Sequence, residues 1–369
     1  MKKHILINSL SGGGAERVVS SLVNFNPEKY SLISIWPDQD YELCNNVEYT
    51  VLIEKRKNIL IDLFFAVFNL ISLIRERKIT SINSHLFWAN YVNLFCSIYT
   101  KHQTYCTHCV SFFSKYKKGN LNYYIHYFLC RHLLSRATGH TFKCNDLMVS
   151  YKKIFEFSNC SVIYNPIDNK KHDIRGVDFS FIDGCNYILC VGRFHETKNQ
   201  ESIIRSLEFL SNDINIIFLG DGPKLKHCKE ISKELGFYHR THFLGYCNNP
   251  SYFYNRVPYI ISSSLSEGFP NVMIEAISYN CFPISYDCET GPREVSSVLY
   301  SCKGESYKRF DVYPLGVIFN SPDCFTISEA IKFSLENKLY VNKSKSNFMS
   351  EILDIEFISR SYSKLGEFS

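Results

Sequence analysis

The stretch Ser264-Leu-Ser-Glu267-Gly-Phe-Pro-Asn-Val-Met-Ile-Glu275-Ala-Ile-Ser-Tyr279 holds two carboxylates eight positions apart. Its Gly-Phe-Pro-Asn turn precedes an apolar run, which predicts a loop leading into a helix with Asn271 as a candidate N-cap. Backbone amides at the start of a helix can bind an anion. The stretch therefore predicts a phosphate pocket with an acid on either side. The alternative is an ordinary capped core helix whose two acids are solvated.

The composition indicates a folded protein of two domains. A chain of 369 residues exceeds what one hydrophobic core usually supports, and 45% hydrophobic with 21% charged residues is typical of soluble domains. The start Met-Lys-Lys-His-Ile-Leu-Ile-Asn leads directly into a predicted strand, without the apolar stretch of a secretory signal. The 15 cysteines are therefore expected to be reduced thiols in the cytoplasm, and the lone Cys106-Thr-His-Cys109 is not expected to bind a metal.

The net charge of +5 is distributed unevenly along the chain. Residues 1–175 hold 22 Lys and Arg against 13 Asp and Glu (+9), and residues 176–369 hold 19 against 23 (−4). A basic first half suits an anionic surface or an acidic ligand, and the change of sign supports two domains. The sequence has no charged tail or low-complexity tract, so no nucleic-acid partner is expected.

Two apolar segments of the first half have basic neighbours. Ile59 to Ile74 follows Lys55-Arg-Lys57 and is too short to span a membrane, with Asp62 and Asn69 interrupting it. It is predicted to be a helix, either buried in the core or docked at a membrane surface. The aromatic and basic segment Phe112–Lys118 also suits contact with a membrane face.

Short apolar runs alternate with helical patterns, which is typical of parallel sheets covered on both faces. The predicted strands are 4–9, 32–36, 49–53, 80–84, 103–108, 161–164, 187–191, 214–219, 242–244, 259–262, 282–285 and 317–319, and the predicted helices include 15–25, 199–210 and 224–235. Residues 168–184 are polar and irregular, which predicts a linker. We expect a first Rossmann-like domain at 1–170, a second at 185–350, and a C-terminal helix at 351–369 that packs back towards the first.

Glycines and cations follow several predicted strands. Gly12, Gly13 and Gly14 come between the first strand and the first helix, where a backbone can approach a ligand or form only a tight turn. In Val191-Gly-Arg193-Phe-His-Glu-Thr-Lys198-Asn199, a guanidinium and an ammonium follow a strand of the second half. These cations could neutralise a diphosphate without a metal, or they could be solvated.

These pieces occur in the order seen in the retaining GT-B glycosyltransferases, whose signature is two glutamates separated by seven positions. The resemblance covers most of the chain, through 11–17, 164–168, 191–199, 220–223, 243–246, 266–275 and 291–294. It implies an α/β fold of two Rossmann-like, doubly wound domains that face each other across a cleft. The segment Asp287-Cys-Glu-Thr-Gly-Pro-Arg-Glu294 resembles one frequent in bacterial O-antigen and capsule enzymes.

The resemblance also implies roles for individual residues. Arg193 and Lys198 would hold the donor diphosphate, Glu267 the donor sugar hydroxyls and Glu275 the nucleotide ribose. The distal phosphate and sugar would contact the segment made of Gly268, Phe269, Pro270, Asn271 and Val272. Gly13 and Gly14 would line the donor phosphate and the acceptor. His108 resembles the family's cleft histidine beside the sugar, with His85 as a rival.

The implied function is transfer of a hexose or N-acetylhexosamine from a UDP-sugar to a polyprenyl-diphosphate-linked oligosaccharide, with retained configuration. The enzyme would need no metal or other cofactor and would act at the cytoplasmic face of the inner membrane. Asp38-Gln-Asp40 imitates a metal-binding Asp-x-Asp but follows a surface-type turn, and we interpret it as coincidence. The alternatives are a nucleotide-sugar epimerase or sugar phosphorylase on the same fold, and a non-catalytic sugar or lipid-carrier binding subunit.

Overall fold

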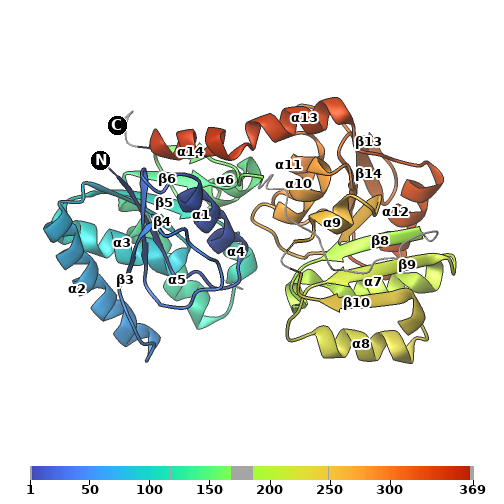
Figure 1. The fold of residues 1–369 in the computed structure, drawn as a ribbon, viewed down its shortest axis with the longest axis horizontal. Helices are drawn as coiled ribbons and strands as arrows, with labels where there is room; N and C mark the ends of the chain where they lie inside the picture. Colours follow the sequence, from blue (N-terminus) through green and yellow to red (C-terminus); the bar gives the residue numbers. More distant parts are fainter. Residues whose placement is uncertain (1, 117, 168–185, 248, 366–369) are drawn as a thin grey trace. The chain divides into compact units, whose positions relative to one another are not determined.

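The computed structural model describes residues 2–116, 118–167, 186–247 and 249–365. Its chain forms two compact units, and each is described by itself (Figure 1). Unit 1 comprises Met1–Pro166 and Leu353–Ser369, and unit 2 comprises Ile167–Ile352. The linker predicted at 168–184 lies outside the described residues.

Unit 1 is built on a parallel sheet whose described strands run in the order β3-β2-β1-β4-β5-β6-β7. Its elements are β1 (Lys3–Ile7), α1 (Gly14–Phe25), β2 (Tyr30–Ser34), β3 (Glu48–Val51), α2 (Ile59–Arg77), β4 (Ser81–His85), α3 (Phe87–Thr100), β5 (Gln103–His108), α4 (Phe112–Lys115), α5 (Leu121–His132), η1 (Leu134–Arg136), β6 (Gly139–Phe142), α6 (Asn145–Lys152), β7 (Cys160–Val162) and α14 (Ile355–Ser363). One core cluster joins the sheet to α2 and α3, and another joins it to α1 and α14. Helices therefore cover both faces.

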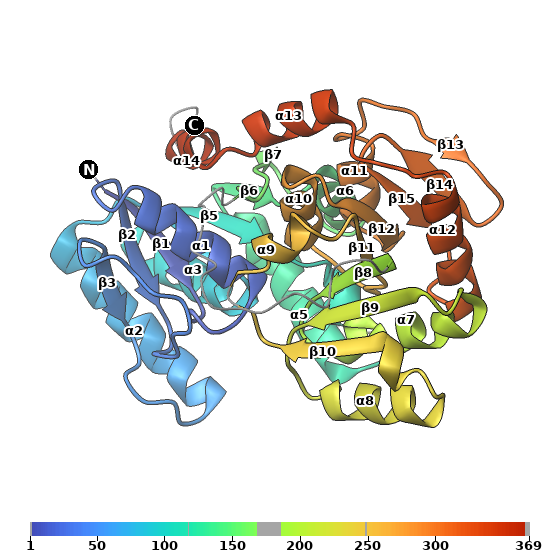
Figure 2. The ribbon, with the colours of Figure 1, turned by 45° about the vertical axis from the view of Figure 1, so that its right-hand side comes forward.

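Unit 2 repeats this plan in the described strand order β10-β9-β8-β11-β12-β15-β14-β13. Its elements are β8 (Asn186–Val191), η3 (Glu196–Lys198), α7 (Gln200–Ser206), η4 (Leu207–Phe209), β9 (Ile214–Leu219), α8 (Leu225–Glu234), η5 (Tyr238–Arg240), β10 (Thr241–Gly245), α9 (Ser251–Tyr254), β11 (Tyr259–Ser262), α10 (Asn271–Ser278), β12 (Phe282–Tyr286), α11 (Pro292–Ser296), β13 (Glu305–Ser306), β14 (Phe310–Tyr313), β15 (Gly316–Phe319), α12 (Cys324–Glu336) and α13 (Lys343–Ile352). Helices α7 and α12 pack together, as Figure 2 shows.

Both sheets are doubly wound: successive strands are added first on one side of the first strand of the unit and then on its other side. This change of side lies between β1 and β4 in unit 1 and between β8 and β11 in unit 2. Ligands of such sheets bind beyond the carboxyl ends of the strands at this point. The predicted α/β doubly wound class is confirmed, and the segments after β1 and β8 become the places to look for a site.

Helix α2 begins at Ile59, as predicted, and continues to Arg77. It is buried along one side only, through Asp62, Ala66, Leu70, Leu73 and Ile74. Among the described residues, no helix combines the length and the hydropathy needed to cross a bilayer.

Helix α14 joins unit 1 through polar contacts that reach the sheet. The hydroxyl of Tyr30 donates a hydrogen bond to the carbonyl of Ser359 at 2.8 Å, and the ammonium of Lys143 donates to the hydroxyl of Tyr362. Lys143 follows β6 and is only 1% exposed. Burial lowers the pKa of Lys143 to about 8. The hydroxyl of Tyr362 therefore compensates a buried cation that water cannot reach.

We expect Tyr362→Phe to lower the free energy of unfolding by about 1–3 kcal/mol at pH 7, because a buried ammonium loses its acceptor. The effect should shrink above pH 8, where folded Lys143, with its pKa of about 8, becomes neutral. Denaturant unfolding at pH 7 and pH 9 measures both. Lys143→Met combined with Tyr362→Phe is the control, because it removes the charge together with its acceptor. If Tyr362→Phe lowered the free energy of unfolding equally in the wild type and in Lys143→Met, the role assigned to the Tyr362 hydroxyl would be contradicted.

Candidate functional site

The carboxyl edge of the unit 2 sheet is a set of interlocked turns. The amide of Gly192 donates to the carbonyl of Leu219, and that of Gly220 donates to the carbonyl of Gly245. Gly220 has a φ of +147°, and a Cβ there would lie 2.0 Å from the carbonyl oxygen of Gly192. Only glycine permits this approach. The turns after β8, β9 and β10 are thereby held together, which fixes the path of the segment that carries Arg193.

Lys198 and Glu267 form an ion pair at this edge. The ammonium Nζ of Lys198, at the end of η3, lies 2.5 Å from Oε1 of Glu267 in the loop after β11. Their side chains are 30% and 17% exposed, so the pair is partly open to solvent. Burial alone would lower the pKa of Lys198, but the charge and hydrogen bond of Glu267 outweigh burial and raise it. Lys198 therefore stays a cation at neutral pH.

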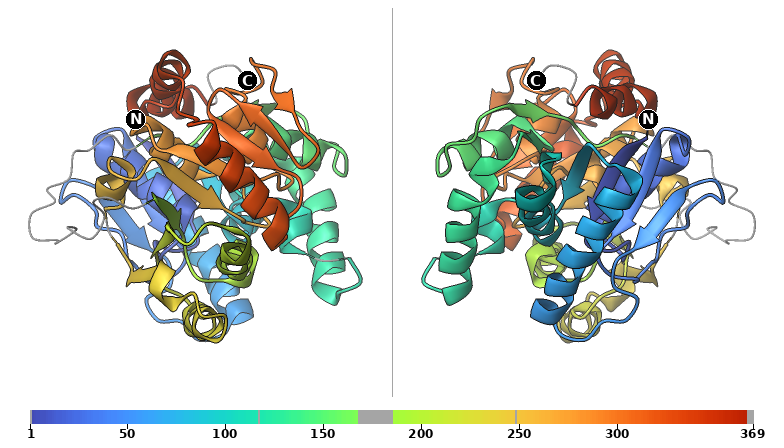
Figure 3. Two further views of the ribbon diagram at one scale, coloured as in Figure 1. Left: turned by 90° about the vertical axis from the view of Figure 1, so that its right-hand side faces the viewer. Right: turned by 90° about the vertical axis from the view of Figure 1, so that its left-hand side faces the viewer.

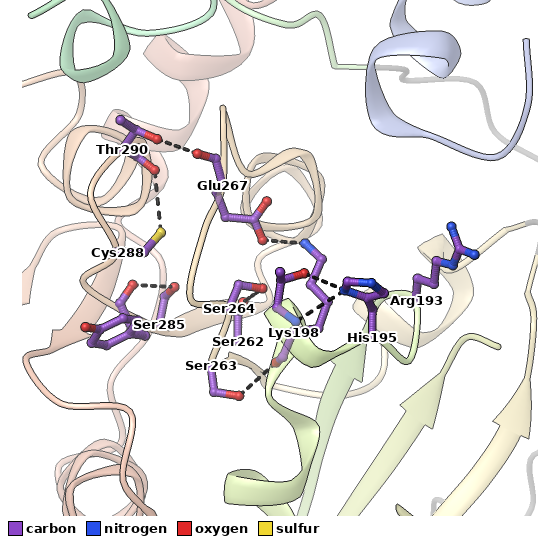
Figure 4. A network of polar contacts seen from close by, with 12 residues as sticks. Arg193, His195, Lys198, Ser262, Ser263, Ser264, Glu267, Ser285, Cys288 and Thr290 are labelled. Atoms are coloured by element: carbon purple, nitrogen blue, oxygen red, sulfur yellow. Dashed lines mark hydrogen bonds and ion pairs between the residues drawn. The ribbon is translucent and has the colours of Figure 1, made fainter. Parts of the chain in front are cut away.

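The two segments that carry this pair are bound to each other through the backbone. The amide of Leu265 donates to the carbonyl of Thr197 at 2.7 Å. The hydroxyl of Ser263 donates to the carbonyls of Lys198 and Asn199 at 3.1 and 2.7 Å (Figure 4). The position of the ion pair is thus set by the fold and does not depend on the two side chains alone.

Arg193 follows β8 in the same turn and is exposed. Figure 4 shows its guanidinium extended past His195 and away from the Lys198–Glu267 pair. Within the described part of the chain, no acceptor contacts this guanidinium. Its five N–H donors are available for a ligand. An exposed guanidinium in the same turn as the paired ammonium of Lys198 is an arrangement that suits an anion with several oxygens.

The start of α10 differs from the sequence prediction. Pro270 occupies the N-cap position and Asn271 is the first helical residue, without a side-chain cap. The amide of Asn271 donates to the carbonyl of Phe269, and the amides of Met273 and Ile274 donate to the carbonyl of Pro270. Asn271 as the N-cap was therefore wrong, because the proline carbonyl closes the first turn. Most amides of that turn already have acceptors, so the local cations are the main attraction for an anion.

The two glutamates of the opening stretch lie in different surroundings. Glu267 is at the sheet edge with Lys198, whereas Glu275 lies inside α10 and is 8% exposed. The hydroxyl of Tyr254 lies 3.5 Å from Oε2 of Glu275. Neither acid is simply solvated, so the alternative of a core helix with two solvated acids does not hold.

The segment after β12 supports the loop of Glu267. The hydroxyl of Thr290 donates to the carbonyl of Glu267. A Cβ on Gly291, whose φ is +99°, would lie 2.7 Å from Cδ of Pro270. Arg293 anchors this segment through Asp287 at 2.5 Å and Asp311 at 2.6 Å. Thr290 was missed as a site residue, although it stands within the motif 287–294 that the sequence had indicated.

In unit 1, the glycine turn after β1 is bound by protein groups. The amide of Gly12 donates to Oδ2 of Asp40 at 2.7 Å, and the hydroxyl of Tyr41 donates to the carbonyl of Gly13. Gly13 is the N-cap of α1 and Gly14 its first residue. Asp38 pairs with Arg56 at 2.8 Å. The Asp38 and Asp40 carboxylates thus have structural partners, and the described residues contain no cluster of His, Cys, Asp or Glu suited to a metal.

The candidate histidines of unit 1 are both buried. His108 is 3% exposed, stacks on Phe142, and its Nε2 lies 3.0 Å from Nδ1 of His140. His85 ends β4 and is fully buried, and neither ring nitrogen has a hydrogen-bond partner among the described residues. Burial lowers the pKa of both well below the usual value. Both rings are therefore neutral at pH 7, and the surroundings of His108 are those of an aromatic core.

Residues 178–311 match the family model of glycosyl transferases group 1. The chain is 27% identical to the N-acetylgalactosamine-N,N'-diacetylbacillosaminyl-diphospho-undecaprenol 4-alpha-N-acetylgalactosaminyltransferase of Campylobacter jejuni, over 80% of this chain and 83% of that one. It is 30% identical to the lipopolysaccharide 1,6-galactosyltransferase of Salmonella typhimurium, over 37% and 38% of the two chains.

Solved structures show the same fold. The lipopolysaccharide outer core galactosyltransferase WaaB has a TM-score of 0.72 at 17% identity, with 99% of this chain and 98% of that one covered. Anabaena HepE, crystallised with UDP, has a TM-score of 0.77 at 14% identity, and the match covers 100% of both chains. The fold is therefore the GT-B fold, as expected.

We expect Gly291→Ala to lower the free energy of unfolding of unit 2 by about 1–3 kcal/mol, because a strained φ is combined with a clash against Pro270. Gly236→Ala is the matched control, since its φ is +76° and nothing lies within 4 Å of the added Cβ. Its loss should be smaller. Denaturant unfolding followed by fluorescence measures both, and an equal loss for the two variants would contradict the support assigned to Gly291.

Proposed function

We propose that this chain, which carries a group 1 glycosyltransferase domain, transfers a sugar from a UDP-sugar to a polyprenyl-diphosphate-linked oligosaccharide in surface polysaccharide synthesis. The sugar is a hexose or N-acetylhexosamine, and its configuration is retained. The observation that carries the proposal is the Lys198–Glu267 pair, 2.5 Å apart at the carboxyl edge of the unit 2 sheet, with Arg193 in the same turn. The activities of the Campylobacter and Salmonella relatives support it.

The diphosphate of the donor binds Lys198 and Arg193. Glu267 uses one of the three N–H donors of the Lys198 ammonium, and the others remain for phosphate oxygens. The Arg193 guanidinium supplies a fork that matches a phosphate. With the carboxylate of Glu267 included, these residues supply a net charge of +1 and several N–H donors to the diphosphate, and binding is proposed to need no metal ion or other cofactor.

The sugar and ribose contact the acids on either side. Glu267 accepts hydrogen bonds from donor sugar hydroxyls through the carboxylate oxygen that Lys198 leaves free, and Gly268–Val272 line the distal phosphate and sugar. Glu275 accepts from the ribose hydroxyls. Gly13 and Gly14 are proposed to line the donor phosphate and the acceptor. The role of His108 beside the sugar stays a prediction, because contact with a sugar requires its enclosed ring to become exposed.

The chemistry follows from the charges. Cleavage of the bond between the anomeric carbon and the phosphate oxygen leaves the electron pair on the diphosphate and positive charge on the ring. Lys198 and Arg193 stabilise the diphosphate as this charge develops. The acceptor hydroxyl attacks the anomeric carbon from the face that the diphosphate leaves, and its proton passes to a phosphate oxygen. Glu267 orients the sugar and is no nucleophile, because the acceptor hydroxyl itself attacks on the face that the diphosphate leaves.

Donor binding should raise the apparent stability of the protein. At a ligand concentration of about 100 times Kd, the gain is about 2.7 kcal/mol. We expect UDP-galactose or UDP-N-acetylgalactosamine to raise the melting temperature, and GDP-mannose and ADP-glucose to raise it less. Lys198→Ala should remove the shift, whereas Lys226→Ala, at an exposed lysine paired with Glu230, should retain it. Equal shifts with all nucleotide sugars would defeat the UDP assignment.

Turnover separates the transferase from the other functions. With a UDP-sugar and a polyprenyl-diphosphate-linked glycan, we expect an elongated glycan with retained anomeric configuration by NMR, in EDTA as in its absence. Lys198→Ala should reduce the rate by about 10²–10³-fold, since it removes charge that stabilises the leaving group. A product formed from UDP-sugar alone would indicate the epimerase, and a folded protein that binds donor without any turnover would indicate the binding subunit.

A further inference from the structure

The outward side of α2 is apolar where a surface helix is normally polar. Six large apolar side chains of its first three turns are 44–72% exposed, namely Ile59, Leu60, Ile61, Phe64, Phe65 and Phe68. All of them except Ile59 recur at the spacing of one helix face. Water contact with such a continuous apolar stripe is unfavourable, and large exposed apolar patches usually mark an interaction site.

Two polar residues that interrupt the apolar sequence of α2 have partners within the protein. Asp62 is 4% exposed, and its Oδ2 accepts a hydrogen bond from Nε1 of Trp36 at 3.1 Å. The side chain of Asn69 donates to the carbonyl of Leu52 at 2.8 Å. The first turns of α2 are therefore apolar on their outward side, while the buried side of the helix is also apolar except for Asp62. Both residues that interrupt the apolar sequence have structural partners, and the exposed stripe contains no charge.

Helix α5 also exposes an apolar stripe. Leu121, Tyr124, Ile125 and Phe128, spaced as one helix face, are 46–72% exposed. Its polar His126 is 6% exposed and lies 2.9 Å from the hydroxyl of Tyr91. Two helices of one unit thus present apolar stripes outward.

The first turns of α2 and α5 project to the same side of unit 1 (Figure 3). Both helices follow strands of one parallel sheet, so their N-terminal ends lie at its carboxyl edge. Exposed lysines precede both stripes, namely Lys55 and Lys57 before α2, and Lys115 and Lys118 before α5. We define the outward stripes of α2 and α5 with these lysines as the docking surface.

We propose that the docking surface binds an anionic lipid bilayer, with the stripes inserted at the level of the headgroups and the lysines contacting lipid phosphates. Apolar insertion and attraction of lysines to anionic lipid are the two contributions that hold interfacial helices. The basic rim favours this occupant over a second copy of the chain, whose own lysines would repel. The biological purpose, access to a lipid-linked acceptor, rests on the proposed function, but the lipid affinity does not.

Sedimentation with vesicles tests the proposal. We expect the full chain to pellet with vesicles of phosphatidylcholine and phosphatidylglycerol (3:1) at low salt, and weakly with phosphatidylcholine alone. Phe64→Gln with Phe68→Gln, and Leu121→Gln with Phe128→Gln, should each lower the partition coefficient about tenfold or more, because glutamine keeps helix propensity but loses the apolar contact. Lys55→Gln with Lys57→Gln should weaken binding chiefly at low salt.

The control pair is Tyr340→Gln with Phe348→Gln, which are 79% and 47% exposed in unit 2 and should bind vesicles like the wild type. Unchanged melting temperatures establish that the variants are folded. Absence of anionic vesicle binding, or equal binding by wild type and stripe variants, overturns the proposal. So does a dimer that the stripe variants abolish without any lipid binding. UDP-sugar melting shifts are measured in parallel, so loss of donor binding with intact vesicle binding would refute only the proposed transferase.

Discussion

The ion pair between Lys198 and Glu267 is the interaction on which the candidate site depends. An ammonium and a carboxylate that are both partly buried lose hydration, and only close, well-oriented pairing offsets that cost. The pairing is possible because the turn after β8 and the loop after β11 are bound to each other through Ser263 and Leu265. Replacing either partner alone would leave a charge without its counterion, so both are expected to be required for function.

The fold supplies this geometry by placing two strands side by side. The strands β8 and β11 pair directly, so the segments that follow them meet at one edge of the sheet. Glycine at position 220 then lets the turn after β9 approach Gly192 closely. A third segment, after β12, adds the hydroxyl of Thr290 to the loop of Glu267. The charge of the site is thus local to a few residues, but its position comes from the whole sheet.

Much of the fold could be predicted from the sequence because buried parallel strands are short, continuous apolar runs. Strands such as Ile214–Leu219 and Tyr259–Ser262 occur at their predicted bounds. Strand β6, Gly139–Phe142, was missed because Gly-His-Thr-Phe is not an apolar run. The antiparallel pair of β13 and β14 was also missed, since such short strands depend on partners that periodicity does not identify.

The charged residues of the candidate site could be predicted from the sequence, but the contacts that hold their segments in place could not. The positions of Arg193, Lys198 and Glu267 after strand ends were sufficient to indicate the edge where they lie. The N-cap was assigned wrongly because a sequence pattern favours an asparagine side chain, whereas the carbonyl of Pro270 closes the first turn.

Contacts between distant segments leave no local pattern at all. Lys143 with Tyr362 is such a contact, and so is Thr290 with Glu267. The hydrogen bond from Trp36 to Asp62 of α2 is of the same kind, because it joins residues 26 positions apart in the chain.

A crystal structure of the protein with UDP tests the central claim most directly. The account predicts that the diphosphate lies within hydrogen-bonding distance of the Lys198 ammonium and the Arg193 guanidinium, with the ribose at Glu275 and no metal between them. A diphosphate bound elsewhere, or one that reaches these residues only through a metal ion, would contradict it.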